Sequence, residues 1–209
     1  MTKAFLVLTI LALSVSTYGQ NNTSKWKRVF EEKTIVFYGY DFSHFKLSEA
    51  KRYGEHILPY VGEWIDYMKI RKSSKDIAKQ FGKESVVINY KITDNLVRKI
   101  SNSDLVATSN HSIEEDSLTF YVDEYELEES RGIGLVIFVE RFKKLNNETS
   151  VYYVFFDIST REILMLDCFR NYDADGHGLT NHWGLGLRDS FNRYSNKVYR
   201  KRLKAETRG

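Results

Sequence analysis

The chain has 209 residues, of which 42% are hydrophobic and 28% charged, so it is long enough to bury the core of one ordinary domain. Its single cysteine, Cys168, excludes an internal disulfide. The formal charge of +3 at pH 7 is close to balanced and excludes the strongly basic composition typical of nucleic-acid-binding proteins, so we expect no nucleic-acid partner.

Residues 1–19 have the order of parts found in a secretion signal. Lys3 supplies a positive charge, residues 4–15 form an apolar run, and small or polar residues precede Gln20. The apolar run is shorter than the roughly 20 residues that cross a bilayer as a helix; an uncleaved anchor or a buried N-terminal helix is the alternative. We expect cleavage near Gly19, export to the periplasm or the exterior, and a mature protein, residues 20–209, without a transmembrane span.

The first half of the mature chain predicts two strands and several short helices. Residues 34–40 are rich in β-branched and aromatic side chains, which is typical of a strand buried on both faces, and residues 85–90 predict a second strand. Pro59 interrupts a helical pattern, so residues 50–58 and 60–68 predict two short helices or one kinked helix. Another short helix is expected at 76–81, whereas residues 91–112 are ambiguous.

The second half predicts one helix followed by three neighbouring strands. Within the acidic stretch 113–129, apolar side chains recur at helical spacing, which indicates an amphipathic helix with its acids outward. Apolar runs at 132–142, 150–158 and 162–169 are separated by connections of hairpin length, and such short connections allow only antiparallel neighbours. Because these runs are apolar on both faces, helices are expected to cover at least one side.

A last helix follows, with one continuous apolar stripe that predicts packing against the sheet. The stripe consists of Trp183, Leu187, Phe191, Tyr194 and Val198. Together these elements predict a single α/β domain with a mixed sheet of about five strands, a C-terminal antiparallel three-stranded meander and a packed C-terminal helix.

The stretch 171–182 is the strongest local candidate for metal chemistry. It opens like a calcium loop, with Gly176 at the sixth position, but His182 stands at the twelfth, where a glutamate would close the site. Histidine with carboxylate also suits zinc, which would serve a metal-dependent hydrolase. The alternative is that the loop is only a glycine-rich turn. We expect the protein to have no cofactor, with zinc or calcium in this loop as the one weaker possibility. The candidate metal ligands are Asp173, Asp175, His177 and His182.

A second group of candidates follows the first predicted strand. Asp41, Ser43 and His44 include the residue types of a hydrolytic triad, but the chain has no Gly-x-Ser-x-Gly turn for a nucleophile. Capping of the next helix by the aspartate and serine is the alternative. The aromatic residues of this half either line a groove for a sugar or peptide or fill the core; they are Trp26, Trp64, Tyr38, Tyr40, Tyr60 and Tyr67. Our candidate ligand-binding residues are Asp41, Ser43, His44 and Trp183.

Several motifs resemble those of an uncharacterised family of secreted Bacteroidetes proteins. Residues 37–47, which contain Asp41-Phe42-Ser43, are similar to the "DFS" segment of that family, and residues 132–142, 155–160 and 176–183 are similar to its second half. The resemblance implies a Gram-negative envelope or secreted setting and brings no activity. This chain differs from the family pattern by Asp173-Ala174-Asp175, inserted before the glycines.

More distantly, the order of elements, with a strand ending in Asp-x-x-Thr before a hairpin, resembles the α/β domain of the TolB N-terminal and curli-secretion-protein type. That resemblance implies an envelope assembly protein without catalysis. With the export signal, it favours a non-catalytic binding or assembly module of the bacterial cell envelope, whose partner is an envelope protein or a small ligand. The alternative is a metal-dependent hydrolase that uses the 171–182 loop.

Overall fold

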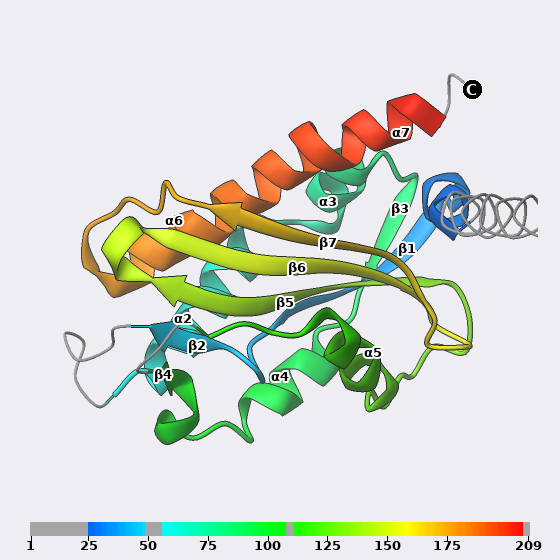
Figure 1. The fold of residues 1–209 in the computed structure, drawn as a ribbon. Helices are drawn as coiled ribbons and strands as arrows, with labels where there is room; N and C mark the ends of the chain where they lie inside the picture. The colour runs from blue at the N-terminus through cyan, green and yellow to red at the C-terminus, as the bar shows by residue number, and fades with distance from the viewer. Residues whose placement is uncertain (1–24, 49–55, 108–110, 207–209) are drawn as a thin grey trace, which may run out of the picture.

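The computed structural model describes residues 25–48, 56–107 and 111–206, which form one mixed sheet with helices on both faces (Figure 1). The predicted signal peptide at 1–19 lies outside the described residues, as does most of the helix predicted at 50–58. No helix in the described ranges is long and apolar enough to cross a membrane.

The strands are β1 (Thr34–Asp41), β2 (Lys46–Ser48), β3 (Ser85–Ile88), β4 (Val106–Ala107), β5 (Ile133–Lys143), β6 (Glu148–Asp157) and β7 (Ile163–Asn171). The α-helices are α2 (Leu58–Arg71), α3 (Ser74–Phe81), α4 (Lys91–Val97), α5 (Glu115–Asp123), α6 (Gly178–Arg193) and α7 (Arg200–Glu206). Turns of 3₁₀ helix lie at Asn102–Leu105 and Lys144–Asn146, and a π-helix, η4 (Tyr194–Tyr199), joins α6 to α7. Residues 25–31 are also helical.

The seven strands occupy five positions across the sheet. β1 and β2 pair in parallel with successive parts of β5, while β3 pairs with β1 and β4 with β2, again in parallel. β5, β6 and β7 form an antiparallel meander. The predicted mixed sheet and its C-terminal meander are therefore confirmed. Seven strands appear where about five were expected because the loop after Asp41 divides one position and β4 adds a short pairing beside β2.

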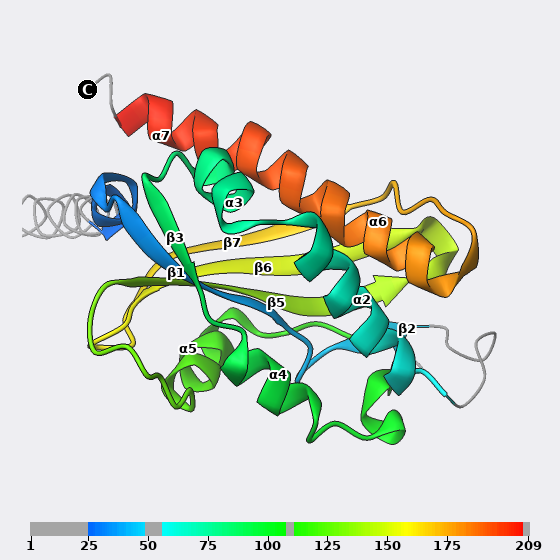
Figure 2. The same ribbon diagram turned by 180° about the vertical axis from the view of Figure 1, so that it is seen from behind.

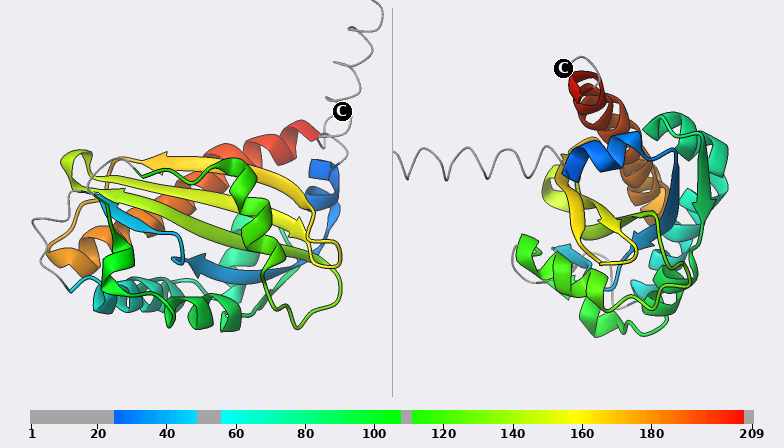
Figure 3. Two further views of the ribbon diagram at one scale, coloured as in Figure 1. Left: turned by 60° about the horizontal axis from the view of Figure 1, so that its bottom comes forward. Right: turned by 90° about the vertical axis from the view of Figure 1, so that its right-hand side faces the viewer.

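Helices cover both faces of the sheet. α2, α3, α6 and η4 pack on one face over the larger apolar core, and α4 and α5 pack on the other over a smaller one (Figure 2). Figure 3 shows the same arrangement from below and from the side. The central strands are apolar on both faces, so the sequence alone cannot assign each of their side chains to one of the two cores.

Two short helices show how local sequence sets their ends. Pro59 lies in the first turn of α2, where its missing amide hydrogen is not needed, and the helix continues without a break to Arg71. The helix predicted at 60–68 is therefore confirmed as part of α2, whereas most of the helix predicted at 50–58 lies outside the described residues, so the choice between two helices and one kinked helix stays a prediction. α3 matches the helix predicted at 76–81; Ser73 and Asp76 form a capping box at its start, and Gly82 ends it in the left-handed conformation.

The last helix packs across the sheet as predicted. Four residues of its stripe are completely buried: Trp183, Leu187, Phe191 and Tyr194. α5 is also confirmed, with Leu118 and Val122 buried. The ambiguous region forms α4, the first 3₁₀ turn and β4, with residues 108–110 outside the described ranges.

Candidate functional site

Asp41, one of the predicted ligand-binding residues, holds together the loop between β1 and β2. Its buried carboxylate accepts hydrogen bonds from the Ser43 amide at 2.7 Å and the Ser43 hydroxyl at 2.5 Å through one oxygen. The other oxygen accepts from the Tyr125 hydroxyl at 2.5 Å. Asp41 and Ser43 therefore make the contacts of a turn that is tied to the end of α5.

His44 and Trp183 lie in different parts of the fold. The His44 ring stacks on Tyr121 of α5, with 3.5 Å between centroids, and burial lowers the pKa of this histidine. Trp183 is completely buried in the core under α2 and α6, where it stacks on Phe142 with 4.6 Å between centroids. The structure brings Asp41, Ser43 and His44 to one loop but does not bring Trp183 to them.

The four predicted metal ligands do not converge. Three are exposed: Asp173, Asp175 and His177. Asp173 pairs with Arg193. His182 is buried, with its Nε2 3.2 Å from Lys144 Nζ, and burial followed by the Lys144 charge lowers its pKa. Among the described residues, which include all four candidates, no three histidine, cysteine, aspartate or glutamate side chains are grouped to hold a metal.

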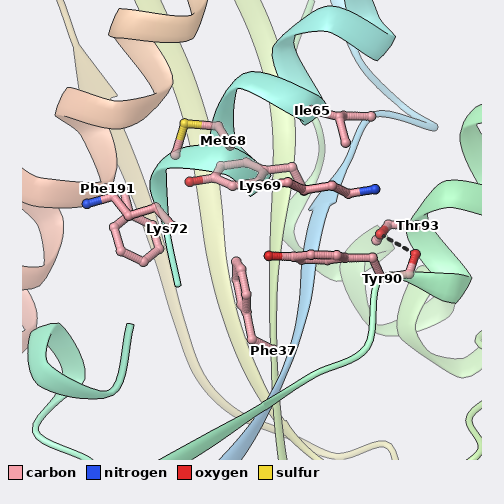
Figure 4. A pocket seen from close by; sticks show the side chains of 9 residues that line it. Phe37, Ile65, Met68, Lys69, Lys72, Tyr90, Thr93 and Phe191 are labelled. Atoms are coloured by element: carbon pink, nitrogen blue, oxygen red, sulfur yellow. Dashed lines mark hydrogen bonds between the residues drawn. The ribbon is translucent and has the colours of Figure 1, made fainter. Parts of the chain in front are cut away.

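The best candidate for a ligand site is a small apolar pocket beside the carboxyl-terminal parts of β1 and β3, between α2, α4 and α6 (Figure 4). We call it the Tyr40 pocket. In sheets with parallel strands, the carboxyl ends of the strands are the usual place for ligands. Its apolar and aromatic walls consist of Phe37, Tyr40, Ile65, Met68, Tyr90 and Phe191. With its open mouth included, the hollow measures about 290 Å³, but the interior is narrow at about 10 Å³, room for one water.

A β-bulge at Gly39 brings two aromatic residues of the pocket wall to the same face of the sheet. Alternation along a strand would place Phe37 and Tyr40 on opposite faces, but the register of β1 against β5 shifts between Phe37 and Gly39. Both rings therefore face the larger core. Gly39 has φ +90°, and a Cβ there would lie 2.7 Å from the Tyr90 ring, so glycine permits both the bulge and the close approach of Tyr90.

The Tyr40 hydroxyl has no hydrogen-bond partner among the described residues, although the side chain is only 6% exposed. Burial, with the nearby Tyr153 and Tyr90 hydroxyls, raises the pKa of Tyr40 well above its usual value, so the phenol stays neutral and can donate. A buried hydroxyl without a partner costs about 1–3 kcal/mol. A polar atom that enters the pocket and meets this hydroxyl would offset that cost.

Two lysines flank the mouth of the pocket and extend to opposite sides (Figure 4). Lys69 lies in α2, and Lys72 is the residue that follows its end. Lys69 Nζ lies 2.7 Å from both carboxylate oxygens of Asp94 and 4.8 Å from the centroid of the Tyr90 ring. Lys72 Nζ donates to the Asn192 amide oxygen at 2.7 Å and lies 5.0 Å from the centroid of the Phe191 ring. Of the two ammonium groups at the mouth, one is therefore paired with a carboxylate and the other with a neutral amide.

Two larger hollows are less suited to a ligand. A cleft of about 830 Å³, open mouth included, lies between α4 and residues 124–128; charged and apolar side chains line it, and Lys91 and Glu128 already pair across it. A hollow of about 920 Å³, measured in the same way, lies near the start of β1 and is lined mostly by charged side chains, of which Arg28 and Asp157 form a pair. Neither combines an enclosed apolar wall with an unpartnered polar group.

Sequence reasoning identified Tyr40 only as one of many aromatic residues, and it missed the two lysines. The signal that was present is Gly39 inside a run of β-branched and aromatic residues, which is typical of a bulge or of close backbone approach. Ile65, Met68, Lys69 and Lys72 also follow helical spacing and so share one helix face. What the sequence did not reveal is that this face lies against β1 and Tyr90.

A scan against protein-family models found no match to the chain, and a search of curated proteins found none either. Function is therefore inferred from the pocket itself.

Proposed function

We propose that the chain is a non-catalytic binding module that takes a small, largely apolar ligand into the Tyr40 pocket and works in an exported, envelope setting. The unpartnered, buried hydroxyl of Tyr40, a residue that lines the apolar pocket, carries the proposal. The lining supplies aromatic surface and hydrogen-bond donors, which are the means of binding. Export is supported by the signal-like order of residues 1–19, and the envelope setting by the resemblance to secreted Bacteroidetes proteins.

The narrow interior means that a ligand enters only when side chains at the mouth move. Met68 lines the pocket and is unbranched, so it can change rotamer at low cost. The bound ligand would then replace the Met68 side chain beside Phe37, Tyr90 and Phe191. We therefore expect weak binding of single-ring compounds, with a polar atom of the ring facing Tyr40.

Phenol, added to the full chain labelled with ¹³C at its methionine methyl groups, tests this function. The chain has three methionines: Met68 lines the pocket, Met165 is a buried residue of β7 that does not line it, and Met1 lies outside the described residues. We expect a saturable shift of the Met68 methyl signal while Met165 stays unchanged. Toluene, which lacks the oxygen that meets Tyr40, is expected to bind more weakly. If neither compound moves the Met68 signal, the proposed function is wrong.

Tyr40→Phe and Tyr153→Phe form a matched pair for the role of the hydroxyl. Both hydroxyls are buried without a partner among the described residues, but only Tyr40 lines the pocket. We expect Tyr40→Phe to abolish the preference for phenol over toluene and Tyr153→Phe to leave it intact. Loss of the preference in both variants would contradict a specific role for Tyr40.

Tyr40→Phe is also expected to keep or raise the stability of the free protein, by up to about 1 kcal/mol, because it removes an unpaired buried hydroxyl. Urea unfolding followed by circular dichroism measures the change. A loss of more than about 1 kcal/mol would mean that the hydroxyl has a strong partner within the fold, which would remove the reason to expect a ligand there.

A further inference from the structure

We propose that the ligand of the Tyr40 pocket is a small carboxylate whose aryl or similar apolar body lies inside the pocket and whose carboxylate binds Lys72 at the mouth. This inference rests on the proposed function, since it adds the charge of the ligand to the same site. The chemical class is a ring with a polar oxygen toward Tyr40 and a carboxylate at the other end, as in 4-hydroxyphenylacetate.

The two lysines at the mouth differ in the charge of the group that each ammonium contacts. Lys69 has a carboxylate partner, since both oxygens of Asp94 lie 2.7 Å from its Nζ. Lys72 instead donates to the neutral amide oxygen of Asn192 at 2.7 Å, and among the described residues no carboxylate lies within 4.0 Å of its ammonium group. An incoming anion gains more from a cation with a neutral partner than from one already paired. The structure therefore favours Lys72 over Lys69 as the anion-binding residue.

The surroundings of Lys72 hold its ammonium group beside the mouth. Asn192 Oδ1 also accepts from Gln80 Nε2 at 2.7 Å, which fixes the amide between two donors. A lysine ammonium carries three donors, so Asn192 leaves others for carboxylate oxygens. Burial lowers the pKa of Lys72, as expected for a cation that is partly removed from water. A bound carboxylate would offset that desolvation.

The experiment compares 4-hydroxyphenylacetate with 4-hydroxyphenylacetamide, which has nearly the same shape and no charge. Both are titrated into the full chain at pH 7, with the Met68 methyl signal as the readout. We expect the carboxylate to bind about tenfold more tightly than the amide, as a charge-assisted hydrogen bond would give. Lys72→Met is expected to remove this preference, so that the acid and the amide bind with equal affinity, and Lys72→Arg is expected to retain it.

Lys75→Met provides the matched control. Lys75 is exposed on α3 and does not line the pocket, so its loss changes the net charge of the protein equally without touching the mouth. We expect the preference for the carboxylate to persist in this variant. If Lys75→Met and Lys72→Met weaken carboxylate binding equally, the effect is one of overall charge and the assignment of Lys72 is wrong.

The pH dependence gives a second readout. The charged groups that act on Lys72 are Asp76 of α3 and Arg188 and Asp189 of α6. Lys72 loses its proton as pH rises through its pKa, which lies below that of an ordinary lysine. The preference, taken as the ratio of the two affinities so that ionisation of the phenol affects the acid and the amide alike, is therefore expected to decline as pH rises to about 11. A preference that is constant to about pH 11 would contradict the inference.

The outcomes separate this inference from the proposed function. Equal affinity for the acid and the amide, with both moving Met68, would overturn the carboxylate and leave a pocket for neutral ligands. No response to the acid, the amide or phenol would overturn both. Circular dichroism of Lys72→Met and Lys72→Arg establishes that each variant is folded, and loss of the preference in a folded Lys72→Arg would show that geometry, and not charge alone, sets it.

Discussion

Replacing Gly39 with alanine is expected to destabilise the protein by about 3 kcal/mol and to abolish the response of Met68 to phenol. Gly39 has φ +90°, a conformation that residues with a Cβ adopt only under strain, and such strain costs about 1–3 kcal/mol. The new Cβ would lie 2.7 Å from Cδ1 and 3.1 Å from Cε1 of Tyr90, a rigid ring, which adds about 1–3 kcal/mol of overpacking. Because Tyr90 is a wall of the pocket, relief of this contact displaces the wall.

Urea unfolding of Gly39→Ala gives the free energy, and Gly62→Ala is its control. Gly62 lies within α2, and a Cβ there meets no atom within 4 Å. Alanine in a helix interior is more favourable than glycine, so Gly62→Ala is expected to stabilise the protein by about 0.5–1 kcal/mol. The same substitution thus has opposite signs at two sites. A Gly39→Ala variant as stable as the original protein would show that the bulge does not depend on glycine.

Local connections explain why the sequence predicted the second half of the sheet well. The hairpins between β5, β6 and β7 are closed by a few residues, so strand order and direction follow from the length of each connection. The parallel pairing of β1 with β5 joins residues about a hundred positions apart, and nothing in either strand names its partner. All three strands were predicted, but the pairing of the first strand with β3 and β5 was not.

The pocket was less predictable than the fold because four separate segments build it. Phe37 comes from β1, Tyr90 from the residue before α4, and Phe191 from α6. The ring centroid of Phe37 lies 6.1 Å from that of Tyr90 and 6.2 Å from that of Phe191. The candidates chosen from the sequence were instead neighbours along the chain. Asp173 and His182, only nine positions apart, end at different places, since the first pairs with Arg193 and the second turns inward beside Lys144.

Helical spacing predicted the stripe of the last helix only as far as the π-helix. Regular α-helical steps from Tyr194 lead to Val198, but η4 makes a wider turn over Tyr194–Tyr199, and a step of five brings Tyr199 inward. Tyr199 is completely buried, and its ring centroid lies 5.2, 4.9 and 5.6 Å from those of Phe30, Phe81 and Phe155. Val198 is only partly buried. The core position that the pattern assigned to valine thus belongs to tyrosine.

Tyr199→Ala is therefore expected to cost about 4 kcal/mol of stability, because it deletes a fully buried ring that three other rings contact. Val198→Ala is expected to cost only about 1 kcal/mol. Urea unfolding of the single variants measures both values. The free energy of unfolding should fall with urea concentration at the same slope in each variant, which shows that the substitution has not changed the denatured state.

Tyr199→Phe isolates packing from the hydroxyl. The Tyr199 hydroxyl is buried without a partner in the described part of the chain, so its removal is expected to leave stability unchanged or slightly higher. We therefore expect Tyr199→Phe to be the most stable of the three variants, Val198→Ala the next and Tyr199→Ala the least stable. If Val198→Ala lowered the free energy of unfolding most, residues 194–199 would follow the α-helical register in solution. The π-helical turn that packs Tyr199 against Phe81 would then not form.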